Sequence, residues 1–222
     1  TEARAEAGLY DAAQRFVERG LLNDDSLFTP GRSIWAPAAI DDFHERYVVQ
    51  GDSGPASFDE KLKGQLEGAD DRTIQFAAEL LYTHFLVPHD TGAAKKLEHI
   101  GIVLSLLEDP VEVPQELARA LEKGVANLGV ARNNRYHLLR VVLEFSRAVK
   151  NHPASEREQL VRDPWMFKRV LFQQDLHRAQ AQAEALLHLV HPGCFEPIIS
   201  HSAQKSIART WEDLVDDPAD DV

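Results

Sequence analysis

The sequence predicts an all-α fold, a single domain of about nine or ten helices joined by short loops with no β-sheet. Apolar residues recur at helical spacing along nearly the whole chain. No stretch sustains the period of two that marks a strand, and capping or turn residues interrupt the helical pattern at short intervals. We therefore expect amphipathic helices that bury one stripe each.

The first helix is expected over residues 4–20, because Leu9 and Phe16 share one apolar stripe and Gly20 can end the helix in a left-handed conformation. Residues 21–36 contain Thr-Pro-Gly, a turn sequence, and are expected to form a loop. Four apolar side chains should anchor this loop in the core: Leu27, Phe28, Ile34 and Trp35.

The next two helices are delimited by turn and capping residues. A helix is expected over about 38–50, and the Gly/Ser/Pro-rich residues 51–55 end it and form the weakest seam in the chain. Ser57 followed by Glu60 is a capping box, which predicts a short helix to about residue 66.

The central part of the chain carries four further helix signals. Asp70 or Asp71 should open a helix that Pro88 stops. Residues 91–107 and 114–122 follow, the latter with proline as its first helical residue. A long amphipathic helix is then expected over 133–150.

The C-terminal part should hold helices whose start residues precede apolar stripes, with Asp163, Asp175 and Ser202 as start signals. The expected ranges are 155–162, 164–173, 175–190 and 203–215. Residues 211–222 contain six acidic residues and no basic one, so we expect an acidic linker there. Residues 1–210 are expected to form one helical recognition or adaptor domain.

Composition excludes several classes of protein. The chain has 222 residues, 44% hydrophobic and 27% charged, and its net charge of −12 repels nucleic-acid phosphates at long range. Its single cysteine, Cys194, cannot form a disulfide within the chain and suits a cytoplasmic location. The longest apolar run, residues 100–107, is too short for a bilayer span, so no membrane partner is expected. The first residues lack Met and a signal pattern, so we expect no secretory peptide and a piece of a longer chain.

Known catalytic motifs do not occur in this sequence. Neither the P-loop motif nor the dinucleotide-binding glycine motif is found, and the serine-hydrolase and zinc-protease signatures are missing too. We therefore expect no enzymatic activity and no cofactor. Paired aspartates at 24/25, 41/42 and 70/71 lie at helix starts or turns, where capping explains them.

Histidine and cysteine residues near the C-terminus are the best metal-ligand candidates. His188, His191 and Cys194 are nitrogen and sulfur donors that zinc accepts, with His177 or His201 as a fourth ligand. Alternatively, His188 complements a helix C-terminus and Cys194 is a structural thiol. Cys194 could also act as a catalytic nucleophile, with His188 or His191 as its general base. No third group that would orient the histidine occurs at a recognisable spacing.

A second metal cluster would combine His84 and His89 with Glu79, near the residue where Pro88 ends a helix. We expect this cluster to bind metal less readily than the first. We expect the chain to bind no metal.

One segment is locally basic. Its arginines, amides and aromatic ring lie at the start of the helix expected over 133–150, and such groups contact phosphates and base edges. The candidate nucleic-acid or partner site consists of Arg132, Asn133, Asn134, Arg135, Tyr136 and Arg140. The alternative is a solvated helix start capped by Asn133. The basic face could extend to Lys168, Arg169, Lys205 and Arg209.

Four segments, taken together, resemble the region N-terminal to the ATPase module in bacterial McrB-like AAA+ proteins, which drive modification-dependent restriction and related antiviral defence systems. The segments are residues 25–35, 58–66, 77–86 and 186–207. The ATPase motifs that define the family do not occur in this chain. The resemblance carries over Trp35 and Phe195 as loop anchors in the core, Glu196 as an acceptor for backbone donors, and Lys205.

The resemblance implies a non-catalytic targeting domain that recognises DNA, plain or modified, or another trigger for the motor. Its partners would be DNA, the AAA+ motor of the parent chain and a nuclease subunit. The alternative is a protein–protein interaction module that senses a phage or partner protein and binds no nucleic acid. The net charge of −12 favours this alternative.

Overall fold

A computed structural model of the chain describes residues 2–51 and 54–210. Within these residues the protein has eleven α-helices and no sheet, which confirms the all-α prediction. The helices are α1 (Glu2–Arg15), α2 (Pro37–His44), α3 (Phe58–Gln65), α4 (Asp71–Phe85), α5 (Ala93–Leu104), α6 (Gln115–Ala120), α7 (Arg135–Asn151), α8 (Ala154–Arg162), α9 (Pro164–Phe172), α10 (Gln180–Val190) and α11 (His201–Thr210).

Three short helical segments of other types complete the fold. Two are π-helical, η1 (Phe16–Leu22) and η2 (Glu45–Val49), and continue α1 and α2 without a break. The third, η3 (Gly129–Asn134), is a 3₁₀-helix that leads into α7. The predicted ranges 4–20 and 38–50 therefore each contain an α-helix followed by a wider turn.

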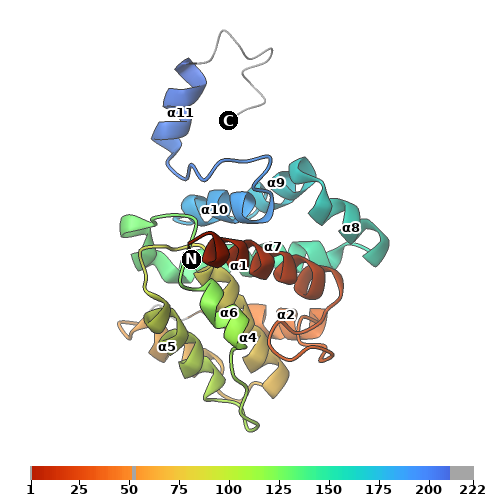
Figure 1. Ribbon diagram of the computed structural model, residues 1–222. Coiled ribbons are helices and arrows are strands. Elements are labelled where there is room, and N and C mark those ends of the chain that lie inside the picture. The colour runs from red at the N-terminus through yellow and green to blue at the C-terminus, as the bar shows by residue number, and fades with distance from the viewer. Residues whose placement is uncertain (1, 52–53, 211–222) are drawn as a thin grey trace.

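The body is built around α4 and α7, which pack against each other. Every residue of α4 from Thr73 to Phe85 is buried. In Figure 1, α1 crosses the front of the body, α8 to α10 lie on one side of it, and α2, α4, α5 and α6 lie on the other. The last helix, α11, stands off the body at the end of the segment that follows α10 (Figure 1).

Gly20 does not cap the first helix as predicted. Its φ angle is not positive, and it lies inside η1 against the Trp35 indole. A Cβ atom built at this position would lie 3.0 Å from that ring. The glycine is therefore needed because helix and indole approach closely, a tertiary reason that local sequence does not show.

Three predicted helix starts are confirmed by their hydrogen bonds. Ser57 and Glu60 form both bonds of the capping box before α3. The Asp70 carboxylate accepts a hydrogen bond of 2.7 Å from the Thr73 amide at the start of α4. Asp163 accepts hydrogen bonds from two backbone amides at the start of α9.

Three other predicted starts are wrong. The side chain of Asn133 caps nothing, because the 3₁₀ turn η3 precedes α7 and no side chain caps that helix. Asp175 accepts a hydrogen bond from the His177 amide, but Arg178 then takes a φ of +59° and α10 begins only at Gln180. The last helix begins at His201, so Ser202 lies inside it.

The seam at residues 51–55 does not divide the fold. Trp35 and Phe43, before the seam, pack edge to face on Phe76, with ring centroids 5.0 and 5.9 Å apart. Tyr47 stacks on Tyr136 at 5.0 Å. One core thus spans the seam. The acidic linker predicted at 211–222 lies outside the described residues, and none of the described helices is long and apolar enough to cross a membrane.

Candidate functional site

The residues of the predicted basic site lie on η3 and the first turns of α7, where they point to different surroundings. Arg132 is 56% exposed, and its Nη1 lies 3.7 Å from Asp90 Oδ2. Asn133 is also exposed, and Asn134 is half-buried without a capping hydrogen bond. These three residues are the outer part of the predicted site.

Arg135 is half-buried. Its guanidinium sits over the rings of Phe58 and Phe85, 5.1 and 5.5 Å from their centroids, which is within cation–π range. Its Nη1 donates to His99 Nε2 at 3.1 Å, and His99 Nδ1 lies 2.8 Å from the Asp59 carboxylate. Because an arginine can only donate, His99 is neutral and its Nδ1–H donates to Asp59.

The electrostatics agree with this arrangement. Burial and the neighbouring Arg135 lower the pKa of His99, although Asp59 opposes the shift. Burial also lowers the pKa of Arg135 itself. Arg135 therefore joins α7 to α3 and α5 as a structural residue and is not available to a phosphate.

Tyr136 and Arg140 are also engaged by neighbours. The Tyr136 ring stacks on Tyr47, whose hydroxyl donates to the Tyr136 carbonyl at 3.2 Å. Arg140 lies between two carboxylates: its Nε is 2.9 Å from Glu144, and its Nη1 is 3.1 Å from Asp175. The guanidinium is thus neutralised where the predicted patch needed a free cation.

Arg140 lines a polar cleft of about 320 Å³ between α2, α7 and the end of α9. Arg147, the other guanidinium of the cleft, donates from Nε to Asp41 at 2.7 Å. Burial and Arg147 lower the pKa of His44 in the same wall. Because both arginines are paired with carboxylates, the cleft does not present a concentrated positive charge.

The histidines and cysteine predicted as metal ligands do not converge. His188 uses both ring nitrogens, with Nε2 3.0 Å from the Tyr10 hydroxyl and Nδ1 2.6 Å from the Phe195 carbonyl. His191 packs edge to face on Phe167, and Cys194 is exposed. Among the described residues, no group of three or more His, Cys, Asp or Glu side chains could hold a metal ion. His177 lies elsewhere, against His137, and the side chain of His201 is outside the description.

The second predicted cluster is dispersed as well. His89 is exposed, whereas burial lowers the pKa of His84 to about 3 and its Nδ1 lies 3.0 Å from the Gln182 carbonyl oxygen. Glu79 is fully buried among donors. These donors are the hydroxyl of Ser26, the amides of Leu27 and Phe28, the side-chain amide of Gln75 and the indole N–H of Trp35.

Glu79 therefore holds the loop between η1 and α2 against α4. Burial raises the pKa of its carboxyl, and the hydrogen bonds from Ser26 and the Leu27 amide oppose that shift. On the other side of the loop, Lys150 donates to the Gly20 carbonyl and to Asp24. The buried carboxylate and the buried ammonium are explained by this structural role.

From the sequence, Lys168 and Arg169 were expected only as an extension of the basic face, and the aromatic surface beside them was missed. We call this surface the Trp165 face: Trp165, Lys168 and Arg169 on α9 together with Phe195 from the loop that follows α10. Trp165 is 55% exposed, and Phe195 packs edge to face on it with ring centroids 5.3 Å apart. The Lys168 ammonium lies 5.6 Å from the Trp165 centroid and 5.9 Å from that of Phe195. Phe195 is therefore half-buried on the surface instead of in the core as expected, and Glu196 beside it is exposed.

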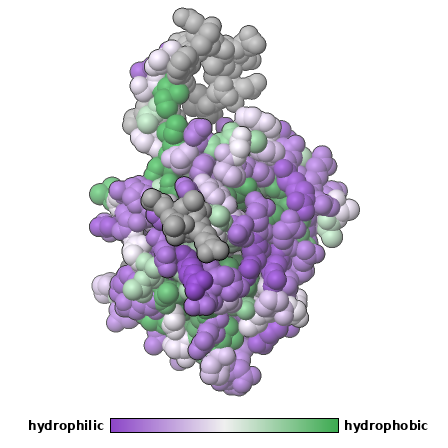
Figure 2. Space-filling view, in the orientation of Figure 1, coloured by the Kyte–Doolittle hydropathy of each residue, from purple (hydrophilic) through white to green (hydrophobic). Residues whose placement is uncertain are grey.

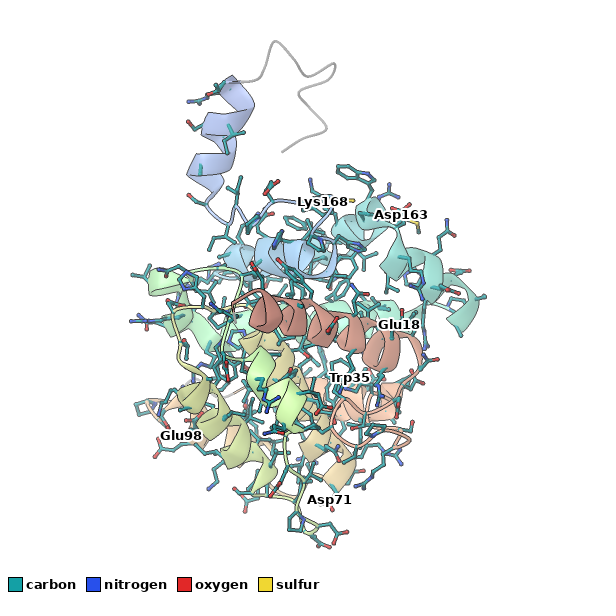
Figure 3. The ribbon with its side chains drawn as sticks, viewed as in Figure 1. Glu18, Trp35, Asp71, Glu98, Asp163 and Lys168 are labelled. Atoms are coloured by element: carbon teal, nitrogen blue, oxygen red, sulfur yellow. The ribbon has the colours of Figure 1, made fainter. Side chains whose placement is uncertain are left out.

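A sequence signal for this face does exist. Asp163 caps α9, so Trp165 occupies the first turn, with Lys168 and Arg169 three and four residues later on the same side of the helix. A large aromatic residue that shares its helix face with two cations is expected at the surface. Figure 3 shows Lys168 at the end of the body nearest the segment that leads to α11, far from Glu98 and Asp71.

The helix α11 also carries exposed apolar and cationic side chains, and it stands off the body (Figure 1). Ile207 is 45% exposed, and Lys205 and Arg209 lie one turn apart on another side of the helix. Figure 2 shows hydrophobic surface on α11 and on the segment that joins it to the body, above a body that is mostly hydrophilic on this face.

Comparisons with family models, curated proteins and solved structures find no match to this chain. Its function is therefore inferred from its own side chains and from the resemblance of four segments described above.

Proposed function

We propose that this chain is a non-catalytic recognition domain that binds a protein partner, within a McrB-like defence NTPase as the resemblance implies. One observation supports this choice over DNA binding. Arg135 and Arg140 of the predicted basic site contact His99 and carboxylates, and only Arg132 of its arginines is exposed. An exposed tryptophan and two cations that form no salt bridge within the described residues gather instead on the Trp165 face.

The charge distribution supports a protein partner. Binding DNA requires cations that are free to neutralise phosphates. Arg135 and Arg140 contact His99, Glu144 and Asp175 instead, and the chain carries a net charge of −12. DNA recognition by Arg132 and its neighbours stays an untested prediction.

The absence of an enzymatic role is a proposal that the perturbed titratable groups support. His84, Lys96 and Lys150 are buried, and burial lowers the pKa of both lysines to about 8. The Lys96 ammonium donates to the Leu121 and Lys123 carbonyls. A catalytic group faces a cleft that admits substrate, whereas these groups hold helices and turns together.

Two binding measurements on the same protein test the proposal. Fluorescence anisotropy with plain and cytosine-modified DNA duplexes, at about 50 and 200 mM salt, should show no binding that weakens with salt. Analytical ultracentrifugation with the nuclease subunit of the same defence system should show a complex.

The proposal is wrong if the chain binds DNA and Arg132→Ala lowers its affinity for DNA. That result would restore the predicted basic site as the DNA contact. The control is Arg72→Ala, which changes an exposed arginine outside the patch and should leave the affinity for DNA unchanged.

A further inference from the structure

We propose that the Trp165 face docks an acidic segment of a partner protein that also carries apolar side chains. This inference rests on the proposed function, because it names the surface and the chemistry through which a protein partner would bind. Three features of the face support it: an aromatic pair whose tryptophan is exposed, cations that form no salt bridge within the described residues, and a neighbouring helix that also carries exposed apolar and cationic side chains.

The aromatic pair provides apolar surface that the fold leaves uncovered. Trp165 contacts Phe195 edge to face, yet more than half of its side chain remains exposed. Large aromatic residues at protein interfaces contribute much of the binding free energy when a partner removes them from water. Trp165 is thus available to bury against apolar side chains of a partner.

The cations of the face lie beside exposed aromatic surface. Within the described residues, neither Lys168 nor Arg169 forms a salt bridge, and the Lys168 ammonium is held over the two aromatic rings instead. Eight arginines elsewhere on the body have a carboxylate within salt-bridge distance: Arg15, Arg19, Arg46, Arg132, Arg140, Arg147, Arg157 and Arg162. The exposed Arg32, Arg72, Arg119 and Arg178 form no salt bridge within the described residues either, but none of them lies over an aromatic ring there.

Charge complementarity therefore selects an acidic occupant. Asp163, the N-cap residue of α9, uses its carboxylate to cap the helix, and Glu196 is exposed at the edge of the face. On a chain of net charge −12, an acidic segment is repelled by most of the surface and attracted where unpaired cations gather.

The neighbouring helix α11 extends the same combination beyond the face. Lys205 and Arg209 are exposed and form no salt bridge within the described residues, and Ile207 is an exposed apolar residue of the same helix. An acidic partner segment that leaves Trp165 toward α11 meets matching charge there.

The test uses the whole chain and two fluorescently labelled synthetic peptides. One peptide consists of glutamate and aspartate with leucines and a central phenylalanine, and the other replaces each acidic residue by lysine. We expect the acidic peptide to bind, with an affinity that falls as salt is raised, and the lysine peptide not to bind. Binding of both peptides alike would overturn the inference.

Variants of residues on the face locate the binding surface. Lys168→Glu and Trp165→Ala should each weaken binding of the acidic peptide by about tenfold or more. The matched controls are Lys63→Glu and Val49→Ala, which change exposed residues outside the face and should leave binding unchanged. Equal effects of Lys168→Glu and Lys63→Glu would overturn the assignment to this face.

Two further outcomes separate the possible failures. In the first, the chain binds phosphatidylserine vesicles, Trp165→Ala loses that binding, and the acidic peptide does not bind. This result would identify a lipid surface as the occupant and overturn the inference. A nuclease-subunit complex that Lys168→Glu does not weaken would overturn the inference while the proposed function stands. If the chain forms no complex with the nuclease subunit or the acidic peptide, both the proposed function and this inference are wrong.

Discussion

Trp35 and Trp165 are the same residue type in opposite situations. Trp35 is fully buried between Phe16 and Phe76, and its indole N–H donates to Glu79 at 2.7 Å. Trp165 is 55% exposed and contacts Phe195 and Lys168. The comparison separates aromatic surface that stabilises this fold from aromatic surface that remains available for binding.

The arginines divide in the same way. Arg135 is held by two aromatic rings and His99, whereas Arg132 is 56% exposed with a single distant carboxylate neighbour. A cluster of arginines in the sequence therefore does not indicate how many of them reach solvent. The following predictions test this division between structural and available side chains.

The largest effect is expected for Trp35→Ala. Removing a fully buried indole leaves a cavity and takes one donor from Glu79, so we expect the free energy of unfolding to fall by about 3–5 kcal/mol. Urea unfolding followed by circular dichroism measures this change. Trp35→Phe is the control, because it keeps most of the volume, and its loss should be smaller. A loss below about 1 kcal/mol in Trp35→Ala would contradict the structural role.

A smaller effect is expected from the buried His84 on acidification. Burial lowers its folded-state pKa to about 3 from the ordinary 6.5, so its contribution to stability is complete above pH 6.5 and is lost as pH falls toward 3. Between pH 6.5 and 5 the loss should be about 2 kcal/mol.

Urea unfolding of the wild type and of His84→Asn at these two pH values measures the difference. The variant should lose less stability than the wild type over this interval. His89→Asn, which changes an exposed histidine, is the control and should behave as the wild type. Parallel losses in the wild type and His84→Asn would show that His84 is not the titrating group.

The two arginines should differ by a moderate amount. Arg135→Met removes a cation from two rings and a hydrogen bond from His99, so we expect a loss of about 2 kcal/mol in unfolding free energy. Arg132→Ala should change it by less than about 0.5 kcal/mol, because Arg132 is exposed. Thermal unfolding of both variants measures this. Similar losses in the two variants would place both arginines in the structural group.

The smallest effect on stability is expected for Trp165→Ala. Its indole is largely in water, so the unfolding free energy should change by about 0.5 kcal/mol or less while binding of the acidic peptide is reduced. Urea unfolding beside the peptide titration measures both quantities. A loss of several kcal/mol would assign Trp165 to the structure and remove it as a recognition residue.

The all-α class and three of the helix starts could be predicted from the sequence. Helical periodicity and caps act within a few residues, so the hydrogen bonds that Ser57, Asp70 and Asp163 accept could be predicted locally. The predicted start at Asn133 is wrong because a 3₁₀ turn precedes α7, and the one at Asp175 is wrong because Arg178 has a positive φ. The one at Ser202 is wrong because α11 begins at His201.

Whether a polar side chain has a hydrogen-bond or salt-bridge partner depends on the tertiary structure. Glu79 meets donors from the loop around residues 26–35, and Arg140 meets Asp175 from a distant segment. Gly20 leaves room for the indole of Trp35, which comes from outside its own helix. These pairings depend on how helices far apart in the chain pack, and periodicity carries no information about that. The Trp165 face depends on tertiary structure as well: Phe195 comes from another segment and packs on Trp165, and Trp165 and Arg169 remain exposed.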